Sequence, residues 1–159
     1  LELRNWGSVK KYVHNSIGYN SRLQPIQGLV LNRKLKDLQE WTEDRNCIAS
    51  SYLEGFVDNK KILLPSISDG NYHSWHLFVI RIKKRNEVAQ ELMKKGIQTV
   101  IHYPIPIHNQ KAYKEHKQYK SKIKNADLYG SELLSLPIFP KMKKTEINYV
   151  INAVNSELK

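Results

Sequence analysis

The stretch Trp75–Ile82 (WHLFVIRI) is the clearest indication of the fold class of this chain. It is rich in β-branched and aromatic residues, and it predicts a buried β-strand. The next residues predict a helix with Asn86 as its N-cap that runs through Lys95, with Gly96 just past its end. A second strand is expected at residues 97–103. Two strands with a helix between them favour a small α/β layer, in which the two strands are parallel or the sheet is mixed.

Helical patterns lie on both sides of this layer. Pro25 suits the first turn of a helix, and apolar residues recur at helical spacing from there to about Phe56. This pattern predicts one long helix, straight or bent, or two successive helices. The residues before Pro25 are expected to be irregular. A final amphipathic helix is expected to begin at Thr145.

Length and composition are those of an ordinary soluble domain. The chain has 159 residues, of which 40% are hydrophobic, and no apolar run approaches the roughly 18 residues that cross a bilayer. We therefore expect no membrane association and no signal peptide. The single cysteine, Cys47, leaves no disulfide within the chain and fits a cytoplasmic location. A first residue of Leu1 rather than Met indicates a fragment whose natural start lies upstream.

The net charge of +11 raises the question of a polyanionic partner. Basic residues gather in one run that is interleaved with Tyr113 and Tyr119: Lys111, Lys114, Lys117, Lys120, Lys122 and Lys124. Such a run can bind single-stranded nucleic acid, although it is more often a solvated helix face. No nucleic-acid-binding signature accompanies it, so we expect no nucleic-acid partner.

Two segments could carry chemistry. Gly18–Leu23 (GYNSRL) precedes the first helix, and its polar side chains could bind an anion near the helix N-terminus or simply cap the helix. Ile101–Gln110 (IHYPIPIHNQ) holds two histidines around a rigid double-proline loop at the end of a strand, where binding sites are often found. The spacing of the histidines does not suit a metal, and none is expected. The residues alone thus indicate an α/β domain with a candidate anion-binding loop.

Taken together, several segments resemble the nucleotide-sugar aminotransferases of the DegT/DnrJ/StrS type, in order and through nearly the whole chain. These segments are Leu3–Gly7, Gly18–Gly28, Lys34-Leu35, Trp41, Arg45, Ile48-Ala49, Tyr52, His76–Arg81, Gly96-Ile97, Ile101–His108, Gln110, Ala112-Tyr113 and Leu133–Pro140. Gly28 stands where the family usually has Ala.

The resemblance implies the small C-terminal α/β domain of a fold-type I aminotransferase. Its sheet would be mixed or antiparallel and packed by helices, with a long N-terminal helix. Residues 1–24 would lead from a missing domain that binds pyridoxal 5'-phosphate, and residues 25–159 would form the small domain. Family members work as homodimers with active sites at the subunit interface.

The implied reaction transfers an amino group, with glutamate as donor, to a keto group of a nucleotide-diphosphate sugar. The IHYPIPIH form looks most like members that act on a 3-keto-6-deoxyhexose in deoxyamino-sugar biosynthesis. The lysine that holds the cofactor lies upstream in the family, and none of the twenty lysines here has a matching context. The chain would then contain no catalytic residue and be inactive alone. A standalone binding module and a truncated, inactive gene product are the alternatives.

The resemblance also implies roles for particular residues. Asn20 matches the Asn that reaches across the dimer to the cofactor phosphate. Arg22 matches an adjacent Arg near the same anionic region, on the substrate side. His102, Tyr103 and His108 match the loop that approaches the sugar and its diphosphate.

Overall fold

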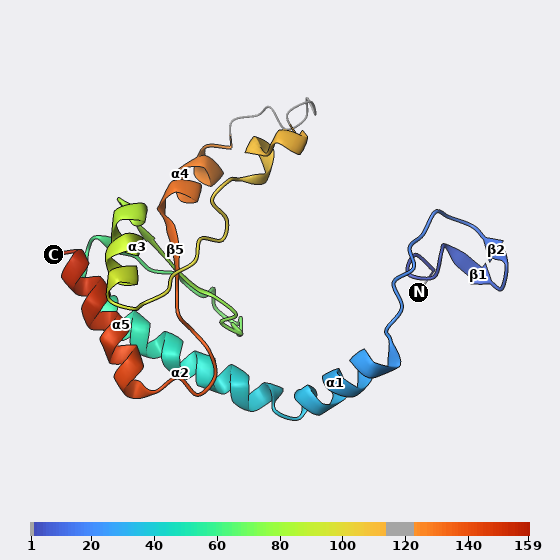
Figure 1. Cartoon of the computed structure of the whole chain (residues 1–159), viewed down its shortest axis with the longest axis horizontal. Helices are drawn as coiled ribbons and strands as arrows, with labels where there is room; N and C mark the ends of the chain where they lie inside the picture. The colour runs from blue at the N-terminus through green and yellow to red at the C-terminus, as the bar shows by residue number, and fades with distance from the viewer. Residues whose placement is uncertain (1, 114–122) are drawn as a thin grey trace. The chain divides into compact units, whose positions relative to one another are not determined.

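The structure, a computed structural model, describes residues 2–113 and 123–159 (Figure 1). Its strands are β1 (Ser8–Lys10), β2 (Val13–His14), β3 (Ile62–Leu63), β4 (Phe78–Ile82) and β5 (Leu133–Leu136). Its α-helices are α1 (Pro25–Leu35), α2 (Leu38–Phe56), α3 (Arg85–Lys94), α4 (Lys124–Glu132) and α5 (Lys144–Glu157), and its 3-10 helices are η1 (Ile107–Asn109) and η2 (Lys111–Tyr113). The chain divides into two units, Leu1–Gln39 and Glu40–Lys159, and each is described by itself. The domain boundary expected after residue 24 stays a prediction.

A three-stranded antiparallel sheet in the order β3-β4-β5 forms the centre of the second unit. Its register places Ile62 opposite Ile82 and Ile80 opposite Leu134. Every second residue of β4 is buried, so Phe78, Ile80 and Ile82 share one face of the strand. The predicted buried strand is confirmed over Phe78–Ile82, whereas Trp75 has a left-handed backbone and the strand begins only after Leu77. Both pairings of the sheet are antiparallel rather than parallel.

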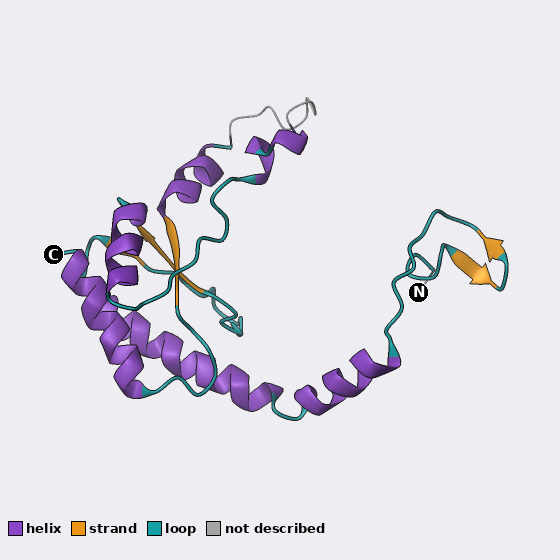
Figure 2. Cartoon of the chain, viewed as in Figure 1, coloured by secondary structure: helices purple, strands orange, loops and turns teal. Residues whose placement is uncertain are grey.

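Helices α2, α3 and α5 contribute side chains to the core at this sheet, and Figure 2 shows them grouped around the strands. Tyr52 of α2 is fully buried, with ring centroids 5.0 Å from Phe78 and 5.8 Å from Phe56. Its hydroxyl donates to the carbonyl of Pro137 at 2.8 Å, and burial raises the pKa of the Tyr52 phenol. The buried donor therefore stays protonated and satisfied, as a buried polar group must be.

The region from Pro25 to Phe56 forms two successive helices, one of the two predicted arrangements. Pro25 is the first residue of α1, where its missing N–H costs nothing. The residue before it, Gln24, donates its backbone N–H to Gln27 Oε1 at 3.0 Å and so begins the helix with a capping box. The last helix, α5, begins at Lys144, one residue before the predicted start.

Helix α3 begins two residues before the predicted start and ends at Lys94, one residue before the predicted end. Asn86 is not the N-cap, because the helix begins at Arg85 and is preceded by Lys84 in the left-handed conformation, with φ of 55°. The Lys84 carbonyl accepts the backbone N–H of Val88, which closes the first turn two residues earlier than predicted. Gly96 lies just past the helix end, as predicted; it has φ of 75° and completes a Schellman motif.

The second strand expected at residues 97–103 is wrong. Among these residues only Val100 pairs with the sheet, through a bridge in which its backbone and that of Ser135 exchange hydrogen bonds of 2.8 and 3.2 Å. The two prolines that follow, Pro104 and Pro106, lack the N–H that would continue the pairing. This segment instead runs as a loop along the edge of β5.

The first unit contains a small antiparallel hairpin of β1 and β2, within the stretch expected to be irregular. Two glycines allow its loops to pack closely. A Cβ on Gly7, which has φ of 71°, would lie 1.7 Å from the carbonyl oxygen of Ser16. A Cβ on Gly18 would lie 2.1 Å from the nitrogen of Gly7, so neither position accepts a side chain without rearrangement.

Candidate functional site

The Gly18–Leu23 segment is held against the first residues of the chain by backbone hydrogen bonds. Tyr19 donates its N–H to the Leu3 carbonyl at 2.7 Å and accepts the N–H of Trp6 at 3.0 Å. The backbone of Asn20 is fixed beside it by an antiparallel bridge to Asn5. Within residues 2–113 and 123–159, the Asn20 side chain has no hydrogen-bond partner. Its amide is thus held at a fixed place with its donors uncommitted.

Arg22 lines a cavity of about 510 Å³ in the first unit. Its Nε and Nη2 donate to Asn5 Oδ1 at 3.1 and 2.6 Å, which fixes the guanidinium group. Lys10, Lys11 and His14 line the same cavity, and the described lining residues include no Asp or Glu. Fixed positive charge without acidic neighbours attracts anions. The sequence prediction of an anion site at Arg22 stays a prediction, but this cavity supplies suitable surroundings for it.

His102 is attached to the edge of β5. Its Nδ1 lies 2.9 Å from Ser135 Oγ, and Ser135 is buried. The ring of Tyr103 is nearly perpendicular to that of His102 at a centroid distance of 5.4 Å, and 73% of the Tyr103 surface is exposed. One histidine is therefore fixed to the sheet, while the neighbouring phenol stays accessible.

His108 is attached to α4 instead. Its Nε2 lies 2.8 Å from Asp127 Oδ1, and the same oxygen accepts Asn109 Nδ2 at 2.7 Å. The hydrogen bond from His108, followed by that from Asn109, lowers the pKa of the Asp127 carboxyl. An ionised carboxylate only accepts hydrogen bonds, so His108 Nε2 must carry a proton here.

The structure brings His102, Tyr103 and His108 together on one loop of the second unit, whereas Asn20 and Arg22 belong to the first unit. Their functional roles stay predictions. Sequence reasoning missed Asp127 and Ser135, which hold the two histidines of the second unit. It also missed Asn5, which holds Arg22, and Lys10, Lys11 and His14, which line the same cavity. The adjacent charges of Lys10 and Lys11 were the only local signal.

Much of the lysine run lies outside the described residues. Lys114, Lys117, Tyr119, Lys120 and Lys122 fall in the part that the structure does not describe. Within the described part, no group of three or more His, Cys, Asp or Glu side chains could hold a metal ion, and every helix is too short or too polar to cross a bilayer.

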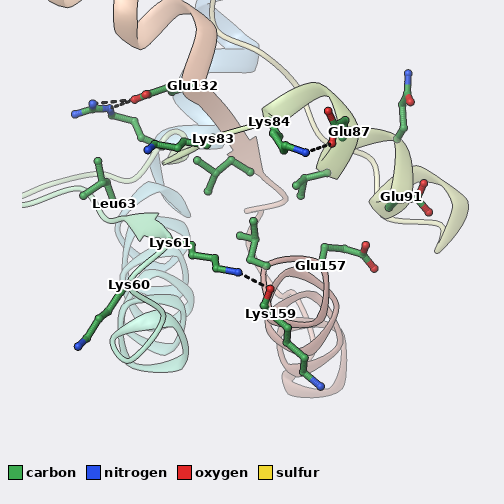
Figure 3. A pocket seen from close by; sticks show the side chains of 15 residues that line it. Lys60, Lys61, Leu63, Lys83, Lys84, Glu87, Glu91, Glu132, Glu157 and Lys159 are labelled. Carbon is green, nitrogen blue, oxygen red and sulfur yellow. Dashed lines mark hydrogen bonds and ion pairs between the residues drawn. The ribbon is translucent and has the colours of Figure 1, made fainter.

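A cavity of about 880 Å³ lies in the second unit (Figure 3), and none of the site residues predicted from the sequence lines it. It is bordered by β3, the end of β4, α3 and the last residues of the chain. Its acidic groups are paired with bases, including Glu132 with Arg81 at 2.9 Å and Glu87 with Lys84 at 3.4 Å. Because its acidic side chains already have basic partners, we do not assign it a ligand.

Comparison with known proteins covers nearly the whole chain. The model of the DegT/DnrJ/EryC1/StrS aminotransferase family matches residues 1–155. A dTDP-3-amino-3,6-dideoxy-alpha-D-galactopyranose transaminase from Aneurinibacillus thermoaerophilus is 45% identical over 96% of this chain and 41% of its own length. A dTDP-3-amino-3,4,6-trideoxy-alpha-D-glucose transaminase from Streptomyces venezuelae is 37% identical over 96% of this chain and 40% of its own.

The fold agrees as well. The crystal structure of S. venezuelae DesV superposes with a TM-score of 0.91 at 35% identity, covering 99% of this chain and 43% of that one. This likeness confirms the expected α/β class with a small antiparallel sheet packed by helices. The chain spans less than half of the length of these relatives. The chain belongs to the DegT/DnrJ/EryC1/StrS aminotransferase family.

Proposed function

We propose that this chain is the C-terminal part of an aminotransferase that uses pyridoxal 5'-phosphate and glutamate to aminate the 3-keto group of a nucleotide-diphosphate 6-deoxyhexose, for deoxyamino-sugar biosynthesis. The match over residues 1–155 carries the proposal. Two relatives that are transaminases of dTDP-3-amino sugars support the position of the keto group and the class of nucleotide. In this proposal the intact enzyme is a homodimer, and the chain alone is inactive.

The cationic cavity of the first unit supports an anionic substrate. Lys10, Lys11 and Arg22 surround a space of about 510 Å³, and two or three such cations suit a diphosphate. His14 donates its Nδ1 proton to the Trp6 carbonyl at 3.0 Å, because a carbonyl only accepts. Its Nε2 is therefore the ring atom left to meet a ligand.

The residues present also fit the phosphate end of the cofactor. The amide of Asn20 has donors that no described residue uses, on a backbone fixed by the bridge to Asn5. We assign it to the cofactor phosphate. When bound, pyridoxal 5'-phosphate supplies an electron sink for amino transfer. The lysine and the acid that hold its ring belong, in this proposal, to the N-terminal domain.

The loop of the second unit supplies groups for the sugar. His102 and His108 are each fixed by a partner, and Tyr103 is exposed beside them. Imidazole and phenol groups hydrogen-bond hydroxyls and phosphate oxygens, so this loop suits a hexose next to a diphosphate. In this proposal their task is to orient the keto sugar.

A chimera tests the proposal. The C-terminal part of the A. thermoaerophilus transaminase that this chain matches is replaced by the whole chain, and the purified protein is assayed with glutamate and a dTDP-linked 3-keto-6-deoxyhexose. We expect formation of the 3-amino sugar by the chimera and none by the chain alone. A folded chimera that retains pyridoxal 5'-phosphate but aminates neither this sugar nor its 4-keto isomer would contradict the proposed reaction. Turnover of the 4-keto isomer alone would contradict the position of amination.

Two variants of the chimera separate the assigned roles. Asn20→Ala should weaken retention of pyridoxal 5'-phosphate by about ten- to hundredfold, because a hydrogen bond to a charged group is lost. His108→Ala should leave the cofactor bound and impair turnover of the keto sugar. If both variants lose only stability, by about 1 kcal/mol as a helix cap does, Asn20 is a capping-loop residue and His108 a packing residue.

A further inference from the structure

Helix α4 is held by two arginines, Arg81 of β4 and Arg85 of α3. Arg81 of β4 pairs with Glu132 at 2.9 Å, and its guanidinium lies 3.6 Å from the ring centroid of Tyr129. Arg85 is buried and donates to the carbonyls of Gly130 and Leu133 at 3.3 and 3.0 Å. These carbonyls lie at the C-terminal end of α4, where a cation also interacts favourably with the helix dipole. The helix is therefore a stable support for whatever is attached to it.

The 101–110 loop rests on this helix at two neighbouring places. A Cβ on Gly130 would lie 3.1 Å from Pro106 Cγ, so the loop packs against the bare backbone of α4 at that position. One turn earlier, Asp127 accepts hydrogen bonds from His108 and Asn109 through a single oxygen. The His108 side chain is only 9% exposed, while that of Asp127 is 44% exposed.

We propose that Asp127 is a positioning residue for the sugar-binding loop: it fixes the ring of His108 with the proton on Nε2 and thereby presents Nδ1 to the nucleotide sugar as a hydrogen-bond acceptor. The proposal rests on the proposed function, because it needs a sugar hydroxyl as the donor to Nδ1. Within residues 2–113 and 123–159, His108 Nδ1 has no hydrogen-bond partner. Asp127 contacts the loop through His108 and Asn109, so in this proposal its effect on sugar binding passes through His108.

A double-mutant cycle in the chimera tests this. Asp127→Ala should raise KM for the keto sugar and lower kcat/KM by about tenfold, the effect of losing a hydrogen bond to a charged group. KM for glutamate should be unchanged. Asp127→Asn keeps an oxygen that accepts the Nε2 proton, and it should restore most of the loss. Asp69→Ala serves as the surface control, because Asp69 lies in the loop between β3 and β4 and not on α4.

The cycle distinguishes positioning from ordinary stabilisation. In a His108→Ala background, Asp127→Ala should cause no further loss of kcat/KM, because the residue through which it acts is gone. An equal loss in both backgrounds, or no loss in either, overturns the positioning role. If the unmodified chimera transfers no amino group, the proposed function fails and the substrate-facing role fails with it. If the chimera is active while the Asp127 variants match it, only the positioning role fails.

Discussion

At the scale of single residues, the Asp127 carboxylate joins the 101–110 loop to α4 by accepting two hydrogen bonds. The donor from His108 is the main reason that the pKa of Asp127 is lowered, and the donor from Asn109 is the second. A lowered folded-state pKa means that the ionised form is favoured by folding. The stabilising contribution is thus complete above the ordinary aspartate value of 3.8 and is lost as the pH falls through the lower folded-state pKa.

We predict that Asp127 titrates below 3.8 in the folded chain. Replacing His108 by Ala should move the midpoint up toward the ordinary value, because the largest cause of the shift is removed. Carbon-detected NMR of the carboxyl group between pH 2 and 6 measures both midpoints. A midpoint in the parent chain equal to that in the His108→Ala variant would mean that the hydrogen bond is absent in solution.

At the scale of helices and strands, some features could be predicted from local pattern and others could not. The strand predicted from WHLFVIRI is present over its last five residues, since β-branched and aromatic side chains suit a buried strand. The strand expected at residues 97–103 failed because strand formation needs a paired neighbour, and only Val100 has one. The start of α3 was missed because Arg85 is buried as a link to α4, a tertiary contact that no local pattern reveals.

The same limit applies to the candidate site. Family resemblance pointed to His102 and His108 as loop residues, and the structure places both on one loop with fixed side chains. Asp127, which fixes His108, lies 19 residues after it, and Ser135, which fixes His102, lies 33 residues after it. Contacts of that separation depend on the packing of α4 and β5, so the motif alone could not identify them.

Two glycine substitutions test the packing of the helices. Gly28→Ala in α1 should raise helix stability by about 0.5–1 kcal/mol, because the nearest atom, Leu23 Cδ2, would be 3.7 Å from the new Cβ. Gly55→Ala in α2 should instead destabilise, because its Cβ would lie 2.7 Å from Ile151 Cδ1 and 2.8 Å from Ile151 Cγ2. Overpacking costs about 1–3 kcal/mol, which exceeds the gain from helix propensity.

Circular dichroism with thermal unfolding checks this pair. The Gly28 variant should show higher helicity at an unchanged or higher Tm, and the Gly55 variant should lose roughly 4 °C in Tm. An increase in Tm for the Gly55 variant would show that Ile151 moves away freely and that α2 and α5 are less tightly packed than described.

At the scale of the whole molecule, α1 carries a set of large apolar side chains on its surface and buries none of its residues. The exposed residues are Ile26, Leu29, Val30, Leu31 and Leu35. Contiguous apolar surface of this kind marks an interface or promotes association. The net charge of +11 opposes self-association, but salt screens that repulsion and does not weaken apolar contacts.

We therefore predict concentration-dependent association of the isolated chain that strengthens as salt is added. Leu29→Lys should reduce it, because Leu29 is 71% exposed on α1. Val57→Lys is the matched control, since Val57 is 68% exposed but lies outside α1. Sedimentation velocity over a range of concentrations measures the effect. Equal association of the two variants would assign the contact to another surface.

We have proposed that the chain supplies the substrate side of an aminotransferase and that the lysine holding the cofactor lies outside it. Peptide mapping after borohydride reduction with pyridoxal 5'-phosphate tests this proposal. Both the chain and the chimera are reduced, digested and analysed by mass spectrometry. We predict stoichiometric labelling of one lysine in the N-terminal part of the chimera and of none of the twenty lysines of this chain. Stoichiometric labelling of one specific lysine of this chain, in either protein, would show that the lysine holding the cofactor lies within it.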